Sequence, residues 1–234
     1  MRRRRPLFFS LKLFAVNFHK REYMMKKKIL ITAGPTREKW DAVRFLSNRS
    51  TGKMGYALAE AARDAGYDVT LVSGPVDLAP VEGVTMVKIE SAAEMAEAVK
   101  SRSPEMDVVI MAAAVADYRP VHIHPGKMKK LPGNLTLELE RTEDILASLG
   151  QMKPEGQILV GFAAETDDLL LNAAGKLQRK NLDWIIANDV SKPDRGFGTA
   201  TNAVTMLGKD GRNIDVPLAS KAVIAAAILE TILA

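Results

Sequence analysis

The architecture of this chain is set by residues 28–65, KILITAGPTREKWDAVRFLSNRSTGKMGYALAEAARDA. The β-branched apolar run at 28–33 is typical of a buried parallel strand. A long glycine-punctuated loop follows, and from Met54 apolar residues recur at helical spacing until Gly66 stops the helix, which we expect Ser50 or Thr51 to cap. The first amides of such a helix lack partners and its dipole is positive there, so this segment predicts an anion site.

Two common phosphate-binding motifs do not fit this loop. A Walker A loop needs a glycine five residues before its Gly-Lys pair and a Ser or Thr after it, whereas Ser47 and Met54 flank Gly52-Lys53 at these positions. A dinucleotide fingerprint needs clustered glycines and an acidic residue at the end of the second strand, which here ends in Ser73-Gly74. The pattern is Rossmann-like, with a longer loop that suits a ligand other than NAD.

The rest of the chain alternates strand patterns with helix patterns. Strands are predicted at 68–73, 85–89, 107–111, 134–140 and 157–161, within 181–190, and as a short-turned hairpin at 202–207 and 214–217. Helices are predicted after the capping box of Ser91 and Glu94, after 141–145, around Lys176 and Lys180, and at 220–233. The predicted fold class is therefore α/β, a Rossmann-like three-layer α/β/α fold with a mainly parallel sheet and a C-terminal antiparallel hairpin.

Composition excludes several function classes. The chain is 47% hydrophobic and carries a net charge of +5 from 33 basic and 28 acidic residues, but residues 1–24 hold seven of the basic and one of the acidic side chains. The remainder is close to neutral, so the charge gives no argument for nucleic acid. No run is long enough to span a membrane. The absence of cysteine excludes disulfides and a thiol nucleophile, so any cysteine in the chemistry must be substrate.

Residues 1–25 form a basic extension, which we separate from a single domain at 26–234. The extension has an Arg-rich start and an apolar stretch, but Lys12 interrupts that stretch and no small-residue cleavage site follows. We expect a disordered extension or an upstream start with Met24 or Met25 as the natural one; an organelle presequence is the alternative.

Three segments after predicted strands carry candidate site residues. In 112–120, AAAVADYRP, small side chains let a flat ring approach main-chain amides and Asp117 can meet a cation, although helix packing would explain the alanines equally well. Residues 122–131, HIHPGKMKKL, suggest a mobile basic flap whose two histidines lack a third metal ligand. Lys176 and Lys180 share a helix face, where like charges repel unless an anion lies between them; a solvated face is the alternative.

The glycine-punctuated loop suggests a family. GPTREKWDAVRFLSNRSTGKMG resembles the signature loop of phosphopantothenoylcysteine synthetase, the coenzyme A biosynthesis enzyme that in many bacteria is the C-terminal half of a fusion with phosphopantothenoylcysteine decarboxylase. Five separate blocks agree in the same order. The chain departs from the family pattern at Glu143, where Pro is usual, and at Ala200, which replaces Asp in the motif from Phe197 to Asn202.

The resemblance implies roles for particular residues. Asn48 and Lys127 are the expected catalytic residues, because an amide can orient the acyl group and a flap lysine can close over the reacting phosphate. The expected nucleotide contacts are Met111, Ala112, Ala113, Ala114, Asp117, Lys127, Thr142, Glu143, Asp144, Ile145, Phe162, Lys176 and Lys180. The expected phosphate and substrate loop comprises Gly34, Ser47, Asn48, Ser50, Gly52, Lys53 and Gly55. The metal ligands stay unknown, with Asp117 as a candidate.

The resemblance also implies an activity, CTP-dependent ligation of 4′-phosphopantothenate to L-cysteine through an acyl-cytidylate, with Mg²⁺ or Mn²⁺. It implies a cytoplasmic homodimer, acting alone or beside a separate decarboxylase, and its bacterial-style motifs favour CTP over ATP. Two other functions fit the architecture. An NAD(P)-dependent reductase would need a Tyr-x-x-x-Lys pair, which occurs only at Tyr23 and Lys27, ahead of the first strand. A non-catalytic nucleotide-binding module would explain Ala200 but not the retained Asn48 and Lys127.

Overall fold

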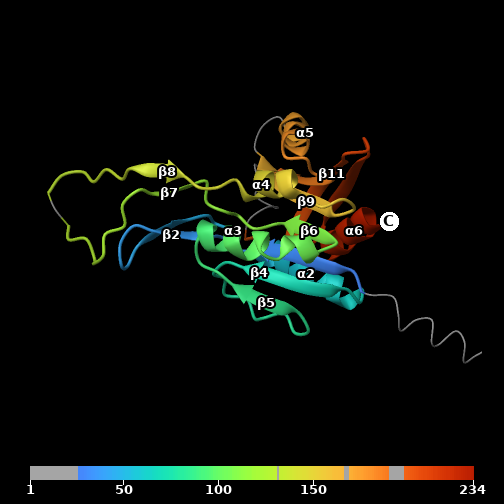
Figure 1. The fold of residues 1–234 in the computed structure, drawn as a ribbon, viewed down its shortest axis with the longest axis horizontal. Helices are drawn as coiled ribbons and strands as arrows, with labels where there is room; N and C mark the ends of the chain where they lie inside the picture. Colours follow the sequence, from blue (N-terminus) through green and yellow to red (C-terminus); the bar gives the residue numbers. More distant parts are fainter. Residues whose placement is uncertain (1–25, 131, 166–168, 190–197) are drawn as a thin grey trace, which may run out of the picture.

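The structure is a computed structural model that describes residues 26–130, 132–165, 169–189 and 198–234. Its centre is an eight-stranded sheet in the order β12-β11-β10-β9-β6-β1-β4-β5 (Figure 1). The strands are β1 (Lys28–Ala33), β4 (Asp68–Ser73), β5 (Thr85–Lys88), β6 (Val108–Met111), β9 (Ile158–Glu165), β10 (Trp184–Asp189), β11 (Thr201–Gly208) and β12 (Asn213–Ser220).

The direction of the strands follows their connections. Strands β1, β4, β5, β6, β9 and β10 run parallel, because helices carry the chain back between most of them. Strands β10, β11 and β12 pair antiparallel, and the last two are joined by residues 209–212, where Gly211 adopts a φ of 89°. The predicted mainly parallel sheet with a C-terminal antiparallel hairpin is confirmed.

Helices cover both faces of the sheet. On one face lie α2 (Lys53–Asp64) and α6 (Lys221–Leu233), whose Leu58 and Ile228 share a buried cluster with Ile31. On the other lie α3 (Ala92–Lys100), α4 (Ile145–Met152) and α5 (Leu169–Arg179), and Leu149 packs in the same cluster as Leu30. A short 3-10 turn, η1 (Ser103–Glu105), precedes β6. Because neighbouring strand residues point to opposite faces, one apolar run supplies both cores, and the three layers are confirmed.

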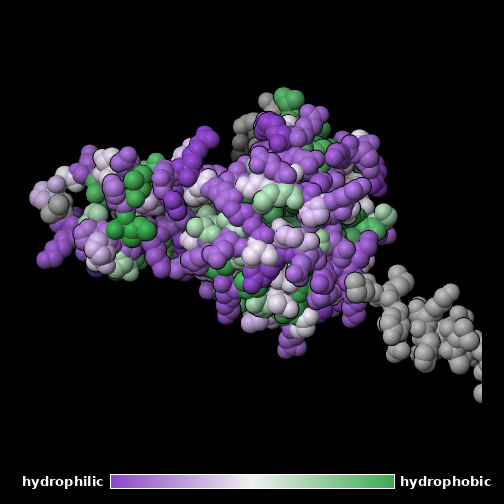
Figure 2. Space-filling view, in the orientation of Figure 1, coloured by the Kyte–Doolittle hydropathy of each residue, from purple (hydrophilic) through white to green (hydrophobic). Residues whose placement is uncertain are grey.

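An arm projects from the body of the molecule (Figure 1). It consists of β2 (Arg37–Lys39) paired with β3 (Phe45–Ser47), and β7 (Tyr118–Pro120) paired with β8 (Leu139–Arg141), together with the intervening residues 40–44, 121–130 and 132–138. Apolar side chains gather on it among hydrophilic ones (Figure 2), and the exposed ones are Val43, Phe45, Tyr118, Val121, Ile123, Leu135 and Leu139. The predicted strand at 134–140 is wrong for 134–138: the paired residues end at Pro120 and Leu139, and the next contact is a single hydrogen bond from the Val121 amide to the Glu138 carbonyl.

Two predicted helix ends need correction. The residue that caps α2 is Gly52, with a φ of 77° and no side-chain cap; Ser50 instead accepts a hydrogen bond from the Gly52 amide at 3.3 Å. Glycine takes this left-handed conformation without strain, whereas a serine cap needs extended backbone. Helix α5 ends at Arg179, so Lys180 lies one residue beyond it. Ser91 caps α3 as predicted.

Within the described ranges, no helix is both long enough and apolar enough to cross a membrane. The basic extension at 1–25 and Phe197 of the departing motif lie outside the described residues.

Candidate functional site

The loops that follow β1 and β6 lie together at the carboxyl end of the sheet. Strand β4 is on one side of β1 and β6 on the other, so the winding direction reverses here, and open α/β sheets bind ligands at such a point. The Ala114 amide donates to the Gly34 carbonyl at 2.9 Å, and the Ala116 amide donates to Thr36 Oγ1 at 3.0 Å. These hydrogen bonds join the two loops into one platform.

Glycine lets α2 approach the end of β1. A Cβ atom on Gly55 would lie 2.5 Å from Ala33 Cβ and 2.8 Å from the Thr32 carbonyl oxygen, so no other residue fits without moving the helix. The first amides of α2 have no acceptors inside the helix, and Lys53 and Gly55 line the cavity described next. The start of α2, where the sequence predicts an anion site, therefore lies at the switch point.

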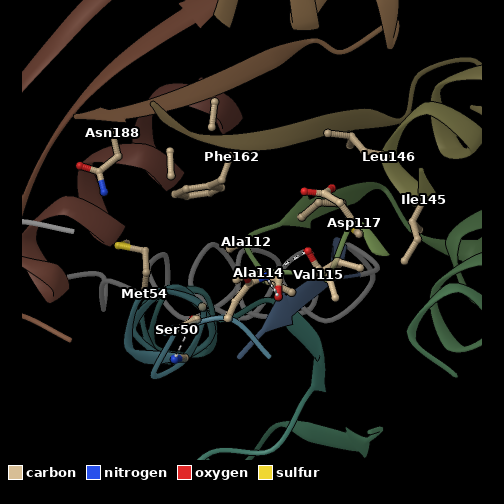
Figure 3. A pocket seen from close by; sticks show the side chains of 18 of the residues that line it. Ser50, Met54, Ala112, Ala114, Val115, Asp117, Ile145, Leu146, Phe162 and Asn188 are labelled. Atoms are coloured by element: carbon tan, nitrogen blue, oxygen red, sulfur yellow. Dashed lines mark hydrogen bonds between the residues drawn. The ribbon is translucent and has the colours of Figure 1, made fainter. Parts of the chain in front are cut away.

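A cavity of about 710 Å³ opens over this platform (Figure 3). This volume is in the range of small-molecule sites. The cavity brings together most of the predicted site residues, which come from the ends of several strands and from α5. Those that line it are Asn48, Ser50, Gly52, Lys53, Gly55, Met111, Ala112, Ala113, Ala114, Asp117, Thr142, Glu143, Asp144, Ile145, Phe162, Lys176 and Lys180.

Asn48 is oriented by main-chain carbonyls. Its Nδ2 donates to the Ala114 oxygen at 3.0 Å and to the Val115 oxygen at 3.2 Å. An amide NH₂ has two hydrogens, and both are used in this way. Its Oδ1 keeps its acceptor capacity, so Asn48 is suited to accept a hydrogen bond from a substrate amine.

Small residues and one aromatic ring shape the middle of the cavity. In Figure 3 the ring of Phe162 lies on the opposite side of the cavity from Ala112 and Ala114, which leaves room for a planar group between them. The Thr142 hydroxyl donates to the Ala116 carbonyl at 2.5 Å, and the Thr142 amide donates to the Asp117 carbonyl at 3.0 Å. These bonds fix the backbone on either side of the exposed Asp117 carboxylate.

Glu143 is engaged with a lysine of the neighbouring helix. Each of its carboxylate oxygens accepts a hydrogen bond from Lys100 Nζ at 2.8 Å, and one also accepts from the Ser148 hydroxyl at 2.7 Å. The Lys100 hydrogen bond lowers the pKa of Glu143, and the Ser148 bond lowers it further. At this position, where the resemblance led us to expect Pro, a carboxylate therefore ties the segment that precedes α4 to α3.

Asp144 has two partners. It caps α4 by accepting from the Ala147 amide at 3.0 Å, and it pairs with Lys180 at 2.8 Å. Burial raises the pKa of Asp144, but the bonds from Lys180 and Ala147, with a weaker attraction from Lys176, outweigh it and the pKa is lowered. The repulsion expected between the two lysines is thus partly offset by a carboxylate of the protein itself.

Three predicted residues do not line the cavity. Gly34 has a φ of 77° and packs closely against Val76, whose Cγ1 would lie 2.9 Å from a Cβ added at Gly34. The Ser47 hydroxyl donates to the Thr36 carbonyl at 2.8 Å and shapes the loop. Lys127 is exposed on the arm.

One end of the cavity was not assigned from the sequence. It is lined by Asn188 of β10, Asn202 of β11 and Lys221 of α6. The Oδ1 atom of Asn188 is buried and has no hydrogen-bond partner among the described residues. Burial, and then the ammonium of Lys53, lower the pKa of Lys221. The position of Asn188 near a strand end was a usable signal, whereas Lys221 reaches the cavity only because α6 packs beside α2.

The cavity suits a cation that arrives with phosphates. In the described part of the chain, no three His, Cys, Asp or Glu side chains gather as metal ligands. Magnesium is commonly held by one or two carboxylates together with substrate phosphates. Glu143 and Asp144 are paired with lysines, so Asp117 is the cavity carboxylate best placed for this role.

The sequence matches known proteins over most of its length. Residues 24–234 match the family described as DNA/pantothenate metabolism flavoprotein C-terminal domain. The chain is 53% identical over 209 residues to the coenzyme A biosynthesis bifunctional protein CoaBC of Bacillus subtilis, which covers 89% of this chain and 51% of that protein. The Vibrio cholerae protein of the same name is 46% identical over 218 residues, or 92% and 54%. The chain therefore spans about half the length of these relatives.

Solved structures show the same fold. The C-terminal domain of a CoaBC protein is 50% identical, has a TM-score of 0.76, and the match covers 88% of this chain and 93% of that one. A DNA/pantothenate metabolism flavoprotein from Streptococcus pneumoniae is 25% identical with a TM-score of 0.74, over 89% and 99%. The chain thus belongs to the family of the DNA/pantothenate metabolism flavoprotein C-terminal domain, as the synthetase half of the bifunctional coenzyme A biosynthesis proteins.

Proposed function

We propose that the protein ligates 4′-phosphopantothenate to L-cysteine with CTP, in coenzyme A biosynthesis. One observation carries this proposal: a single cavity contains an acceptor amide at Asn48, a free helix start at α2 and the lysines 176 and 180. Such a space can hold an acyl group beside a nucleotide. The names of the relatives support a role in coenzyme A biosynthesis.

The first step would activate the carboxylate. A carboxylate oxygen of phosphopantothenate attacks the α-phosphorus of CTP, the bond to the β-phosphate oxygen breaks, and diphosphate leaves with the electron pair. Lysine ammonium groups and the free amides of α2 stabilise the charge that develops on the phosphates. Lys127 would add a positive charge at the α-phosphate when the arm closes over the cavity. The product is an acyl-cytidylate.

The second step would form the amide. The cysteine nitrogen attacks the acyl carbon, the bond to the CMP oxygen breaks, and the nitrogen loses a proton. Asn48 Oδ1 accepts a hydrogen bond from the amine and so aims the nitrogen lone pair at the carbonyl. The chain contains no cysteine of its own, so the thiol of the product comes from the substrate alone.

Mg²⁺ or Mn²⁺ would be held by Asp117 together with the phosphates, and when bound it neutralises charge on the leaving diphosphate. We also propose a cytoplasmic homodimer, as the family resemblance implies, and a phosphopantothenoylcysteine decarboxylase as its partner activity, because the relatives are named as bifunctional proteins. A non-catalytic module would bind nucleotide in the same cavity without turnover.

The test separates the two steps. The protein is incubated with phosphopantothenate, CTP and Mg²⁺, cysteine is added later, and diphosphate and CMP are followed separately. We expect diphosphate that depends on phosphopantothenate, and CMP only after cysteine is added. Nucleotide binding without diphosphate from either CTP or ATP would refute the ligase and leave the non-catalytic module.

A further inference from the structure

A buried carboxylate lies on the arm, in the turn between β2 and β3. Asp41 follows β2 and is only 1% exposed. Its Oδ1 accepts hydrogen bonds from the amides of Val43 at 2.8 Å and Arg44 at 2.7 Å, which closes a local turn. Its Oδ2 accepts from Arg44 Nε at 2.9 Å and from the Met128 amide at 3.2 Å. Oδ1 thus bonds only to its own turn, whereas Oδ2 also reaches Met128, 87 residues away in the sequence.

Arg44 completes the connection. Its guanidinium pairs with Asp41 at 2.6 Å and its Nη2 donates to the Met128 carbonyl at 2.8 Å. It also lies over the Trp40 ring at 4.7 Å, while the Trp40 carbonyl accepts from the His124 amide at 2.9 Å. Both polar main-chain groups of Met128 are therefore bound by one ion pair.

These contacts are the long-range anchors of the basic flap. Among the described residues of 122–137, the hydrogen bonds that reach beyond the segment all end on Trp40, Asp41 or Arg44. Burying a charged carboxylate is costly unless it is fully hydrogen-bonded. The buried Asp41 is therefore not expected beside a loop that is merely solvated. Burial raises the pKa of Asp41, but the amide and guanidinium donors outweigh this and hold the pKa far below its usual range. The anchor is therefore charged at neutral pH.

We propose that Asp41 is a positioning residue for Lys127. Through Met128, the next residue along the chain, it fixes the point from which the Lys127 side chain reaches the reacting phosphate. This inference rests on the proposed function, in which Lys127 contacts the α-phosphate. Asp41 itself touches no substrate; it holds the flap at Met128, next to the lysine.

Asp41→Asn tests the role of a single oxygen. The amide oxygen can still accept from Val43 and Arg44 and keep the turn, whereas the NH₂ group that replaces Oδ2 cannot accept from Arg44 or Met128. Met128→Pro removes the same hydrogen bond from the other side by deleting the amide donor. Glu140→Gln is the matched control, because it breaks the exposed ion pair with Arg119 on the same arm without touching the flap.

Trypsin reports whether the flap is released. Cleavage after lysines 129 and 130 should be at least about tenfold faster in Asp41→Asn and Met128→Pro than in wild type, and unchanged in Glu140→Gln. Equal cleavage rates in all four proteins would show that Asp41 does not hold the flap, and would overturn the proposal.

Kinetics report whether the released flap acts through Lys127. In Asp41→Asn, kcat for phosphopantothenate-dependent diphosphate release should fall about ten- to a hundredfold, with KM for CTP nearly unchanged, because a small misplacement of a contacting group is costly. Combined with Lys127→Ala, Asp41→Asn should cause no further loss.

Three outcomes are distinguishable. Additive losses in the double variant, or an unchanged or increased kcat in Asp41→Asn, would overturn the positioning role while leaving the ligase intact. A loss that appears equally in Glu140→Gln would mark a general effect on the arm and also overturn it. Failure of the wild-type protein to release diphosphate would refute the proposed function and this inference with it.

Discussion

Gly55→Ala should separate α2 from the strand it covers. The added methyl carbon would lie 2.5 Å from Ala33 Cβ and 2.8 Å from the Thr32 oxygen, where contacts below 3.0 Å essentially never occur. Since ordinary carbon contacts begin near 3.5 Å, the helix must move by about 1 Å. Overpacking of this kind costs about 1–3 kcal/mol, and 2 kcal/mol corresponds to a Tm lowered by roughly 4–8 °C in a domain of this size.

The same displacement should also impair phosphate binding, and kcat/KM for CTP should fall by more than the loss of stability alone would cause. The amides of the first turn of α2 move with the helix, and a misplacement of about 1 Å can cost about a hundredfold in rate. Thermal unfolding and kcat/KM for CTP measure the two effects. Gly126→Ala is the control for stability, because no atom lies within 4 Å of its added Cβ. If Gly55→Ala keeps the wild-type Tm and kcat/KM, the close approach of α2 to β1 does not position the site.

Two other predictions follow from individual hydrogen bonds. Asn48→Ala should leave diphosphate release largely intact but slow CMP release after cysteine addition by about a hundredfold. Quenched-flow measurement of both products checks this, with Asn134→Ala on the arm as the control. Equal slowing of both products would contradict the prediction. Asp144→Asn keeps the cap of α4 but loses the ion pair with Lys180. At pH 7 this should lower the free energy of unfolding by about 0.5 kcal/mol. The value is small because the Asp144 side chain is half exposed. The folded pKa of Asp144 is lowered, so this contribution is complete above about pH 5 and disappears as the pH falls through the folded pKa. Urea unfolding at about pH 7 and pH 2.5 checks this, and an equal difference at both values would contradict it.

Local patterns predicted most of the fold. The apolar run of β1 and the serine that caps α3 act over a few residues, so the sequence shows them directly. The rule that ligands bind beyond the carboxyl ends of parallel strands predicted a site at the segment of Asp117, and the family resemblance added Asn48 and Phe162; all three line one cavity.

Features that depend on distant partners could not be predicted in this way. Lys221 enters the cavity because α6 packs beside α2, and Glu143 accepts a hydrogen bond from Lys100, 43 residues earlier in the chain. The alternation at 134–140 resembles a strand, but a strand forms only where a neighbouring strand pairs with it. Strand β7 pairs with β8 only as far as Leu139, so residues 134–138 have no strand partner. Asp41 gave no signal at all, since its partner at Met128 is 87 residues away.

The acyl-cytidylate can be followed by an isotope. Phosphopantothenate labelled with ¹⁸O in its carboxylate is converted with CTP and cysteine by the wild-type protein, and the released CMP is analysed by mass spectrometry. If the carboxylate attacks the α-phosphorus, one labelled oxygen remains on the phosphate of CMP. Unlabelled CMP, or label in inorganic phosphate released together with CDP, would contradict the proposed chemistry at its first step.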